Sequence, residues 1–222
     1  MIKKVLIISL PRSGSTFVYE SLATYMLKND SKSHRWFMKN DLTNLLDEPF
    51  TTELRDREMF LNRLERISNL DSWVVKHLVD QTCHMNTDIL SRLHRESDRV
   101  VILKRNHIDQ ILSLAVAEKL NSFGYKNPTL ELTRSEIKQA CWDVSLNRFK
   151  LNQCFGDKVI NYENLHYPRQ IVSEVLDLDI NTIKPFEIPI RKSHTNIVNR
   201  DECLEWIKNY YLPRFWNMGS LN

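Results

Sequence analysis

The feature that most constrains the fold is an apolar run that ends in a glycine-containing turn and resumes as a helical pattern. Residues 3–10 read "KKVLIISL", an apolar and β-branched segment typical of a strand buried on both faces. "PRSGST" follows directly and contains one of the four glycines of the chain. The apolar residues of segment 14–28 then fall near one helical stripe. The stretch therefore predicts a strand, a tight turn and a helix in direct succession.

Such a turn builds an anion site. The first amide N–H groups of a helix have no partner within it, and the helix dipole adds about half a positive charge at that end. Gly14 lets the backbone approach a ligand closely, while Ser13, Ser15 and Thr16 add hydroxyl donors and Arg12 adds a cation. The alternative is a plain strand–turn–helix in which the serines only cap the helix.

The turn differs from a Walker A loop. That motif reads GxxxxGK[ST], with a lysine directly after the second glycine. Here the loop is shorter and the cation, Arg12, precedes Gly14. The sequence therefore argues against bound Mg²⁺ and NTP hydrolysis, and no metal ligands are predicted.

Strand and helix patterns alternate along the rest of the chain, which predicts one α/β domain over residues 1–222. We expect a central parallel sheet with helices on both faces and ligands at the carboxyl ends of the strands. The expected strands are residues 3–10, 72–78, 98–104 and 157–162. The expected helices are residues 14–28, 51–69, 86–97, 107–120, 133–155, 163–177 and 200–212, with irregular chain at 29–51 and 181–199.

Composition excludes several classes of protein. With 31 basic and 28 acidic residues the net charge is +3, too balanced for a general nucleic-acid binder. No apolar run reaches the roughly 18 residues that cross a membrane, and the first run is too short for a signal peptide. The four cysteines, Cys83, Cys141, Cys154 and Cys203, are widely spaced, which favours reduced thiols in a cytoplasmic protein.

A second stretch, "RVVILKRNHIDQILSLA" at 99–115, strengthens the anion-site prediction. Arg105 and Asn106 follow a strand, Asn106 can cap the next helix, and Ser113 lies eight residues after Arg105. A cation at a strand end and a hydroxyl on the adjacent helix can meet at one phosphate. The alternative is a surface arginine that pairs with Asp109.

The two stretches together resemble the sulfotransferases that use 3′-phosphoadenosine 5′-phosphosulfate (PAPS). "PRSGSTF" (11–17) resembles their 5′-phosphosulfate loop, and "RNHIDQILS" (105–113) resembles their 3′-phosphate motif. "WVVKHL" (73–78), "VINYENL" (159–165) and "IRKSHTNIVN" (190–199) are similar to further motifs of the family, in the same order. The resemblance covers most of the chain.

The resemblance implies a three-layer sandwich like that of the P-loop NTPases, with PAPS as donor and PAP as product. It also implies roles for individual residues. These are Arg12, Ser13, Gly14, Ser15 and Thr16 around the 5′-phosphosulfate, Phe17 and Tyr162 at the adenine, Arg105 and Ser113 at the 3′-phosphate, and Arg191 and Lys192 in a late basic loop. Two departures stand out, since His107 replaces the family's usual proline and Arg12 replaces the lysine of its cytosolic members.

Sulfuryl transfer to a hydroxyl or amine needs cations on the leaving side and a general base for the acceptor. Arg12 and Lys76 are the expected cations. The base stays open between His77, which follows Lys76, and three residues after the first helix. Those three are His34, Asp41 and Glu48.

The acceptor is left open between a small molecule, a glycan and a peptide, and "RWF" at 35–37 is its expected contact. Two other functions stay possible, a P-loop nucleotide kinase or NTPase and a catalytically inactive PAP- or PAPS-binding module. The remaining aromatic residues are expected to be structural. Trp142, Leu146 and Phe149 are predicted to be core, and Trp206, Tyr210 and Phe215 are predicted to dock the last helix.

Overall fold

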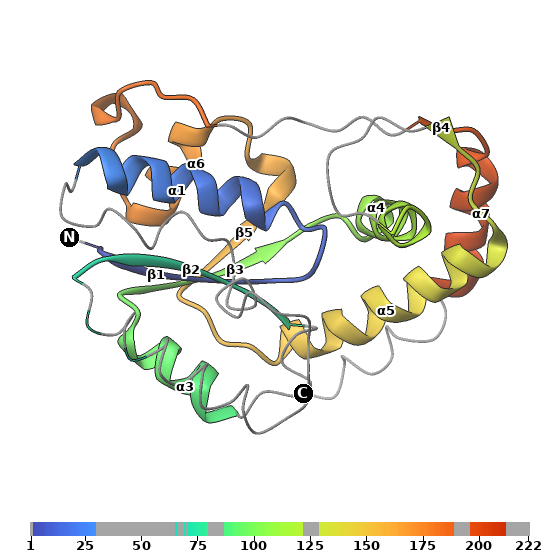
Figure 1. Ribbon diagram of the computed structural model, residues 1–222, viewed down its shortest axis with the longest axis horizontal. Coiled ribbons are helices and arrows are strands. Elements are labelled where there is room, and N and C mark those ends of the chain that lie inside the picture. Colours follow the sequence, from blue (N-terminus) through green and yellow to red (C-terminus); the bar gives the residue numbers. More distant parts are fainter. Residues whose placement is uncertain are drawn as a thin grey trace.

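The computed structural model describes residues 2–29, 65, 69, 71–79, 87–121, 129–188 and 196–211. A four-stranded sheet with the order β2-β1-β3-β5 lies at its centre, and every neighbouring pair is parallel (Figure 1). Its strands are β1 (Lys4–Ser9), β2 (Trp73–Leu78), β3 (Arg99–Lys104) and β5 (Lys158–Asn161). The four strands expected from apolar runs are therefore confirmed.

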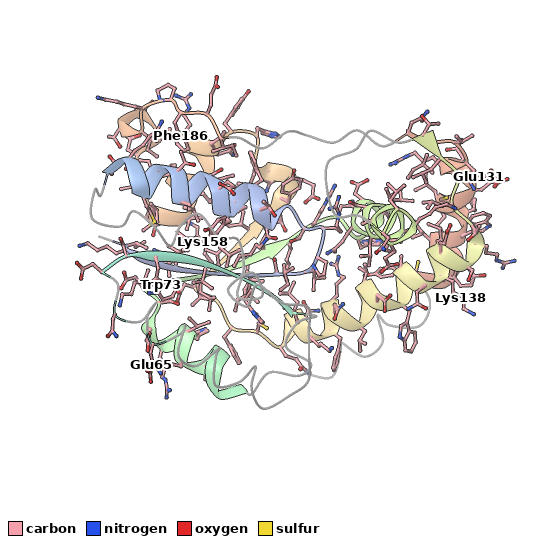
Figure 2. All side chains as sticks on the ribbon, in the orientation of Figure 1. Glu65, Trp73, Glu131, Lys138, Lys158 and Phe186 are labelled. Atoms are coloured by element: carbon pink, nitrogen blue, oxygen red, sulfur yellow. The ribbon has the colours of Figure 1, made fainter. Side chains whose placement is uncertain are left out.

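Helices cover both faces of this sheet, which confirms the predicted α/β sandwich. α1 (Ser15–Asn29) and α6 (Pro168–Leu176) lie on one face, and α3 (Thr87–Glu96) lies on the other (Figure 1). Alternate strand residues such as Ile7 and Leu103 pack in one core with α1 and α6. Trp73, 2% exposed, points from β2 toward the α3 side (Figure 2).

A second group of helices lies at the carboxyl ends of the strands (Figure 1). It consists of α4 (His107–Lys119), α5 (Arg134–Asn152) and α7 (Arg200–Tyr211), which share a separate core. Caps define where two of them begin. Asn106 Oδ1 accepts a hydrogen bond from Ile108 N at 2.9 Å, and Thr133 and Glu136 form a capping box at the start of α5. Trp206 and Tyr210 of α7 pack against this core, as expected.

The structure differs from the elements predicted from the sequence at three places. Segment 181–199, expected to be irregular, contains η3 (Ile180–Thr182) at its start and β6 (Asn196–Ile197), which pairs in parallel with β4 (Thr129–Leu130). The helix expected at 163–177 is instead η2 (Tyr162–Asn164) followed by α6, because Pro168 takes the first helical position.

The third correction concerns α5. Trp142, Leu146 and Phe149, predicted to be core, are 57%, 44% and 52% exposed. Their spacing places them on one face of the helix, while Cys141 and Val144 point into the core shared with α7. Helix 51–69, the "RWF" stretch and Phe215 fall outside the described residues, apart from Glu65 and Asn69. In the described part of the chain, no helix has the length and apolarity needed to cross a membrane.

Candidate functional site

The turn between β1 and α1 has the backbone of an anion-binding loop. Gly14 has a φ of 82°, in the left-handed region, and its carbonyl accepts the first helical hydrogen bonds from Phe17 N at 2.9 Å and Val18 N at 3.3 Å. A Cβ on Gly14 would lie 2.1 Å from the ring of Tyr162. Both the conformation and the close approach therefore require glycine at this position. The Ser13 hydroxyl donates to Leu10 O at 2.7 Å and fixes the turn from within.

The structure joins this loop to the second predicted motif, although the two are far apart in the sequence. Arg12 Nε donates to Ser113 Oγ at 2.9 Å, and an Arg105 guanidinium N–H donates to Arg12 O at 2.7 Å. Arg105 does not pair with Asp109. Instead, Asp109 Oδ1 lies 3.6 Å from a guanidinium nitrogen, Nη2, of Arg200. The alternative of a surface Arg105–Asp109 pair is therefore wrong.

Tyr162 brings the predicted adenine and 3′-phosphate residues together. Its ring lies against Gly14 and meets the ring of Phe17 edge-on, with centroids 6.4 Å apart. The guanidinium of Arg105 lies 5.1 Å from the Tyr162 ring centroid, a cation–π distance. The neighbouring Glu163 accepts a hydrogen bond from Asn106 N at 2.6 Å, which ties the end of β5 to the end of β3.

Lys76 reaches the same turn from β2. Its side chain is 6% exposed, and its Nζ donates to Thr16 Oγ1 at 3.3 Å. Glu20 follows Thr16 by one helical turn, so both lie on one face of α1. Burial raises the pKa of the Glu20 carboxyl, and the positive charge of Lys76 opposes that rise. Glu20 was not identified as a site residue from the sequence. Its i, i+4 spacing from Thr16 is the only sequence signal that could have indicated it.

His77 does not join this group. Successive residues of a strand point to opposite faces, so His77 points away from the face where Lys76 meets α1. Its side chain is 1% exposed, and burial lowers its pKa to about 4. Among the residues that the structure describes, neither ring nitrogen has a hydrogen-bond partner. His77, one of the candidate general bases, therefore does not share the face on which Lys76 reaches the loop.

His34, Asp41, Glu48, Arg191 and Lys192 lie outside the described residues. His107, the departure from the family pattern, begins α4 and stacks on Tyr211 with ring centroids 4.5 Å apart. Burial lowers the pKa of His107, and the nearby charge of Arg148 lowers it further.

The described site is thus a helix N-terminus surrounded by cations. Arg12, Lys76 and Arg105 come from three different segments and meet at one glycine turn. Backbone N–H groups, hydroxyls and guanidinium groups in such an arrangement suit a phosphate or sulfate ester. The Phe17 and Tyr162 rings beside it offer faces on which a base can stack.

Comparison with known proteins adds little to this description. No family model matches the chain, and no curated protein matches it. Among solved structures, the chain is similar to shikimate kinase from Bacteroides thetaiotaomicron, with 14% identity and a TM-score of 0.46. The alignment covers 80% of this chain and 96% of that one. A likeness of this degree carries no information on function, which therefore has to come from the residues of the site.

Proposed function

We propose that this protein is a sulfotransferase that moves the sulfuryl group of PAPS to a hydroxyl or amine of an acceptor and releases PAP. One observation carries the proposal. The glycine turn, which suits a 5′-phosphosulfate, is bonded directly to the Arg105 and Ser113 pair, which suits a second phosphate. PAPS carries two such anionic groups on one nucleoside, whereas ATP and AMP have no 3′-phosphate.

The proposed reaction is an in-line displacement at sulfur. The acceptor oxygen or nitrogen forms a bond to sulfur, the bond from sulfur to the bridging oxygen breaks, and its electron pair stays on the 5′-phosphate of PAP. The acceptor proton goes to a base, which the described residues do not assign. Arg12 and Lys76 are the groups proposed to stabilise charge on the leaving side.

A nucleotide kinase is the second candidate, and one contact favours it. Lys76 Nζ lies 3.3 Å from Thr16 Oγ1, so β2 brings a lysine to a loop that has none of its own. In a kinase this lysine would contact the β- and γ-phosphates of ATP. Phosphate release from Mg²⁺–ATP, or transfer to an acceptor, would support the kinase instead.

Calorimetry with PAP, AMP and Mg²⁺–ATP tests the proposal. PAP should bind most tightly, because only PAP fills both anion positions. Arg105→Ala should weaken PAP binding by roughly 1.5–3 kcal/mol, the scale of a charge-assisted hydrogen bond. Arg169→Ala removes an exposed arginine of α6 and serves as the matched control.

Equal affinity for PAP and AMP would remove the assignment of the 3′-phosphate. Transfer of labelled sulfate from PAPS to a panel of glycan, peptide and phenolic acceptors then separates an enzyme from an inactive binding module. Tight PAP binding without transfer to any acceptor would favour the module.

A further inference from the structure

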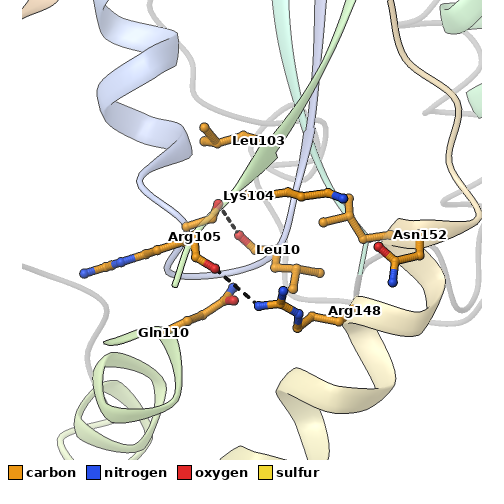
Figure 3. Close-up of a pocket in the computed structure, with 9 residues that line it drawn as sticks. Leu10, Leu103, Lys104, Arg105, Gln110, Arg148 and Asn152 are labelled. Carbon is orange, nitrogen blue, oxygen red and sulfur yellow. Dashed lines mark hydrogen bonds between the residues drawn. The ribbon is translucent and has the colours of Figure 1, made fainter. Parts of the chain in front are cut away.

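A hollow lies beside the loop, where the last turns of α5 approach the ends of β1 and β3 (Figure 3). The hollow is partly open to solvent. Leu10, Ser13 and Arg105 line it and also belong to the candidate site. Its other lining residues are Leu103, Lys104, Gln110, Arg148, Leu151 and Asn152.

The Lys104 side chain lies on the face of the sheet away from α1. Leu103 packs in the core under α1 and α6, so the next residue, Lys104, points to the opposite face. In Figure 3 the Lys104 side chain runs toward Asn152, whereas the Arg105 side chain runs away from the hollow. Arg148 Nη1 donates a hydrogen bond to Arg105 O at 3.3 Å, and this bond holds the Arg148 guanidinium at the hollow.

Two cations at the hollow have no carboxylate partner among the described residues. In the described part of the chain, neither Lys104 nor Arg148 forms an ion pair with a carboxylate, although other basic side chains do. Arg148 acts electrostatically on two neighbouring groups. Burial lowers the pKa of His107 and raises that of Tyr211, and the charge of Arg148 lowers both. Two like charges facing one hollow repel each other, and an anion between them relieves that repulsion.

We propose that this hollow binds one oxyanion, held by Lys104, Arg148 and the amide of Asn152. The oxyanion is a sulfate, phosphate or carboxylate group, either as a free ion or as part of the acceptor. The fork of Arg148 offers paired donors to two oxygens, Lys104 adds a point charge, and Asn152 adds a neutral donor. Only the assignment to an acceptor rests on the proposed sulfotransferase activity.

Binding measured with the nucleotide site filled tests the proposal. Wild-type protein saturated with PAP is titrated with sodium sulfate, against sodium chloride at matched ionic strength, and the melting temperature and the dissociation constant are recorded. Lys104→Gln/Arg148→Gln should raise the dissociation constant for sulfate about tenfold or more, because two charged donors are lost. Lys138→Gln removes an exposed lysine of α5, the helix that also carries Arg148, and should leave sulfate binding unchanged.

A second variant covers the case in which the double substitution does not fold. Asn152→Asp places a carboxylate beside the two cations and should abolish sulfate binding without removing any contact of Arg148. Sulfate affinities that agree among wild type, both variants and the Lys138→Gln control would overturn the proposal.

Two further measurements identify the source of the oxyanion and keep the proposals apart. Phenyl β-glucuronide has a carboxylate where phenyl β-glucoside has a hydroxymethyl group. Selective binding of the glucuronide therefore indicates an acceptor group, and binding of sulfate alone indicates a free ion. PAP affinity is measured on the same variants and should not change. If PAP fails to bind any of the proteins, the sulfotransferase proposal fails, while sulfate binding that depends on Lys104 and Arg148 still supports the hollow.

Discussion

At the scale of single residues, Gly14 is the position where the backbone tolerates no side chain. We expect Gly14→Ala to lower the free energy of unfolding by about 1–3 kcal/mol, because a side chain is strained at a positive φ. The new Cβ would also lie 2.1 Å from the Tyr162 ring, so the loop must shift and PAP affinity should fall with stability. Urea denaturation and calorimetry check both effects. If Gly14→Ala kept the stability and the PAP affinity of the wild type, the conclusion that the turn requires glycine at this position would be wrong.

Arg12 tests the proposed chemistry at the same scale. We expect Arg12→Ala to lower kcat by about 10²–10³, the usual effect of losing one preorganised donor. PAP affinity should fall less, since PAP has no sulfuryl group and the stabilisation grows only as charge develops. Arg12→Lys keeps the charge and should retain more activity than Arg12→Ala.

The rival role of Arg12 is structural, because its Nε is bonded to Ser113 Oγ. In that case Arg12→Ala would lose PAP binding and thermal stability together while kcat stayed normal. Measuring kcat, PAP affinity and melting temperature on one preparation decides between the two roles.

Adjacent residues also show what a sequence does and does not reveal about the site. The sequence offered Lys76 as a cation and the adjacent His77 as one candidate base, yet a strand sends neighbouring side chains to opposite faces. That rule was available from the sequence once residues 72–78 were predicted to be a strand. The contact between Arg12 and Ser113 could not be predicted from the sequence, because it depends on how two segments about 100 residues apart pack together.

At the scale of elements, the capping box of α5 was predictable, since its residues lie within one turn. Thr133 Oγ1 accepts from Glu136 N at 3.3 Å, and Glu136 accepts from Thr133 N at 2.7 Å. Burial raises the pKa of Glu136, but the hydrogen bonds from Thr133 and the contact and charge of Lys119 together outweigh it, so the pKa is lowered. We expect Thr133→Ala to cost about 1 kcal/mol of stability, the typical effect of losing a helix cap.

Ser135→Ala is the matched control for that cap, because Ser135 is exposed in the first turn of the same helix. Denaturation curves of the two variants are compared with that of the wild type. Equal stability of Thr133→Ala and Ser135→Ala would show that the cap contributes nothing.

Other properties of elements depend on partners that a local pattern cannot identify. The stripe of Trp142, Leu146 and Phe149 has the spacing of a buried face, but periodicity does not say whether another element covers it. The two-residue strands β4 and β6 carry too few residues to show a pattern, so only the folded structure reveals their pairing. Strand–helix alternation, by contrast, was sufficient to predict the parallel sheet.

At the scale of the whole molecule, the sheet carries the candidate anion site at the carboxyl ends of its strands and also holds a buried histidine, His77. His77 lies on β2 with 1% exposure, and its ring has no hydrogen-bond partner in the described part of the chain. Burial lowers its pKa to about 4 in the folded protein. In the unfolded chain the imidazole has an ordinary pKa near 6.5.

This difference predicts that the protein loses stability in mild acid. As the pH falls below about 6.5, the unfolded chain takes up a proton at His77 before the folded protein does, so unfolding becomes more favourable. Between pH 7 and pH 4 the loss attributable to His77 should reach about 3 kcal/mol. Urea denaturation at half-unit pH steps measures it as the difference between wild type and His77→Leu, which cannot titrate at this position. His166→Gln removes an exposed histidine and should follow the wild-type curve. Parallel curves for wild type and His77→Leu would mean that the His77 pKa is not lowered in the folded state.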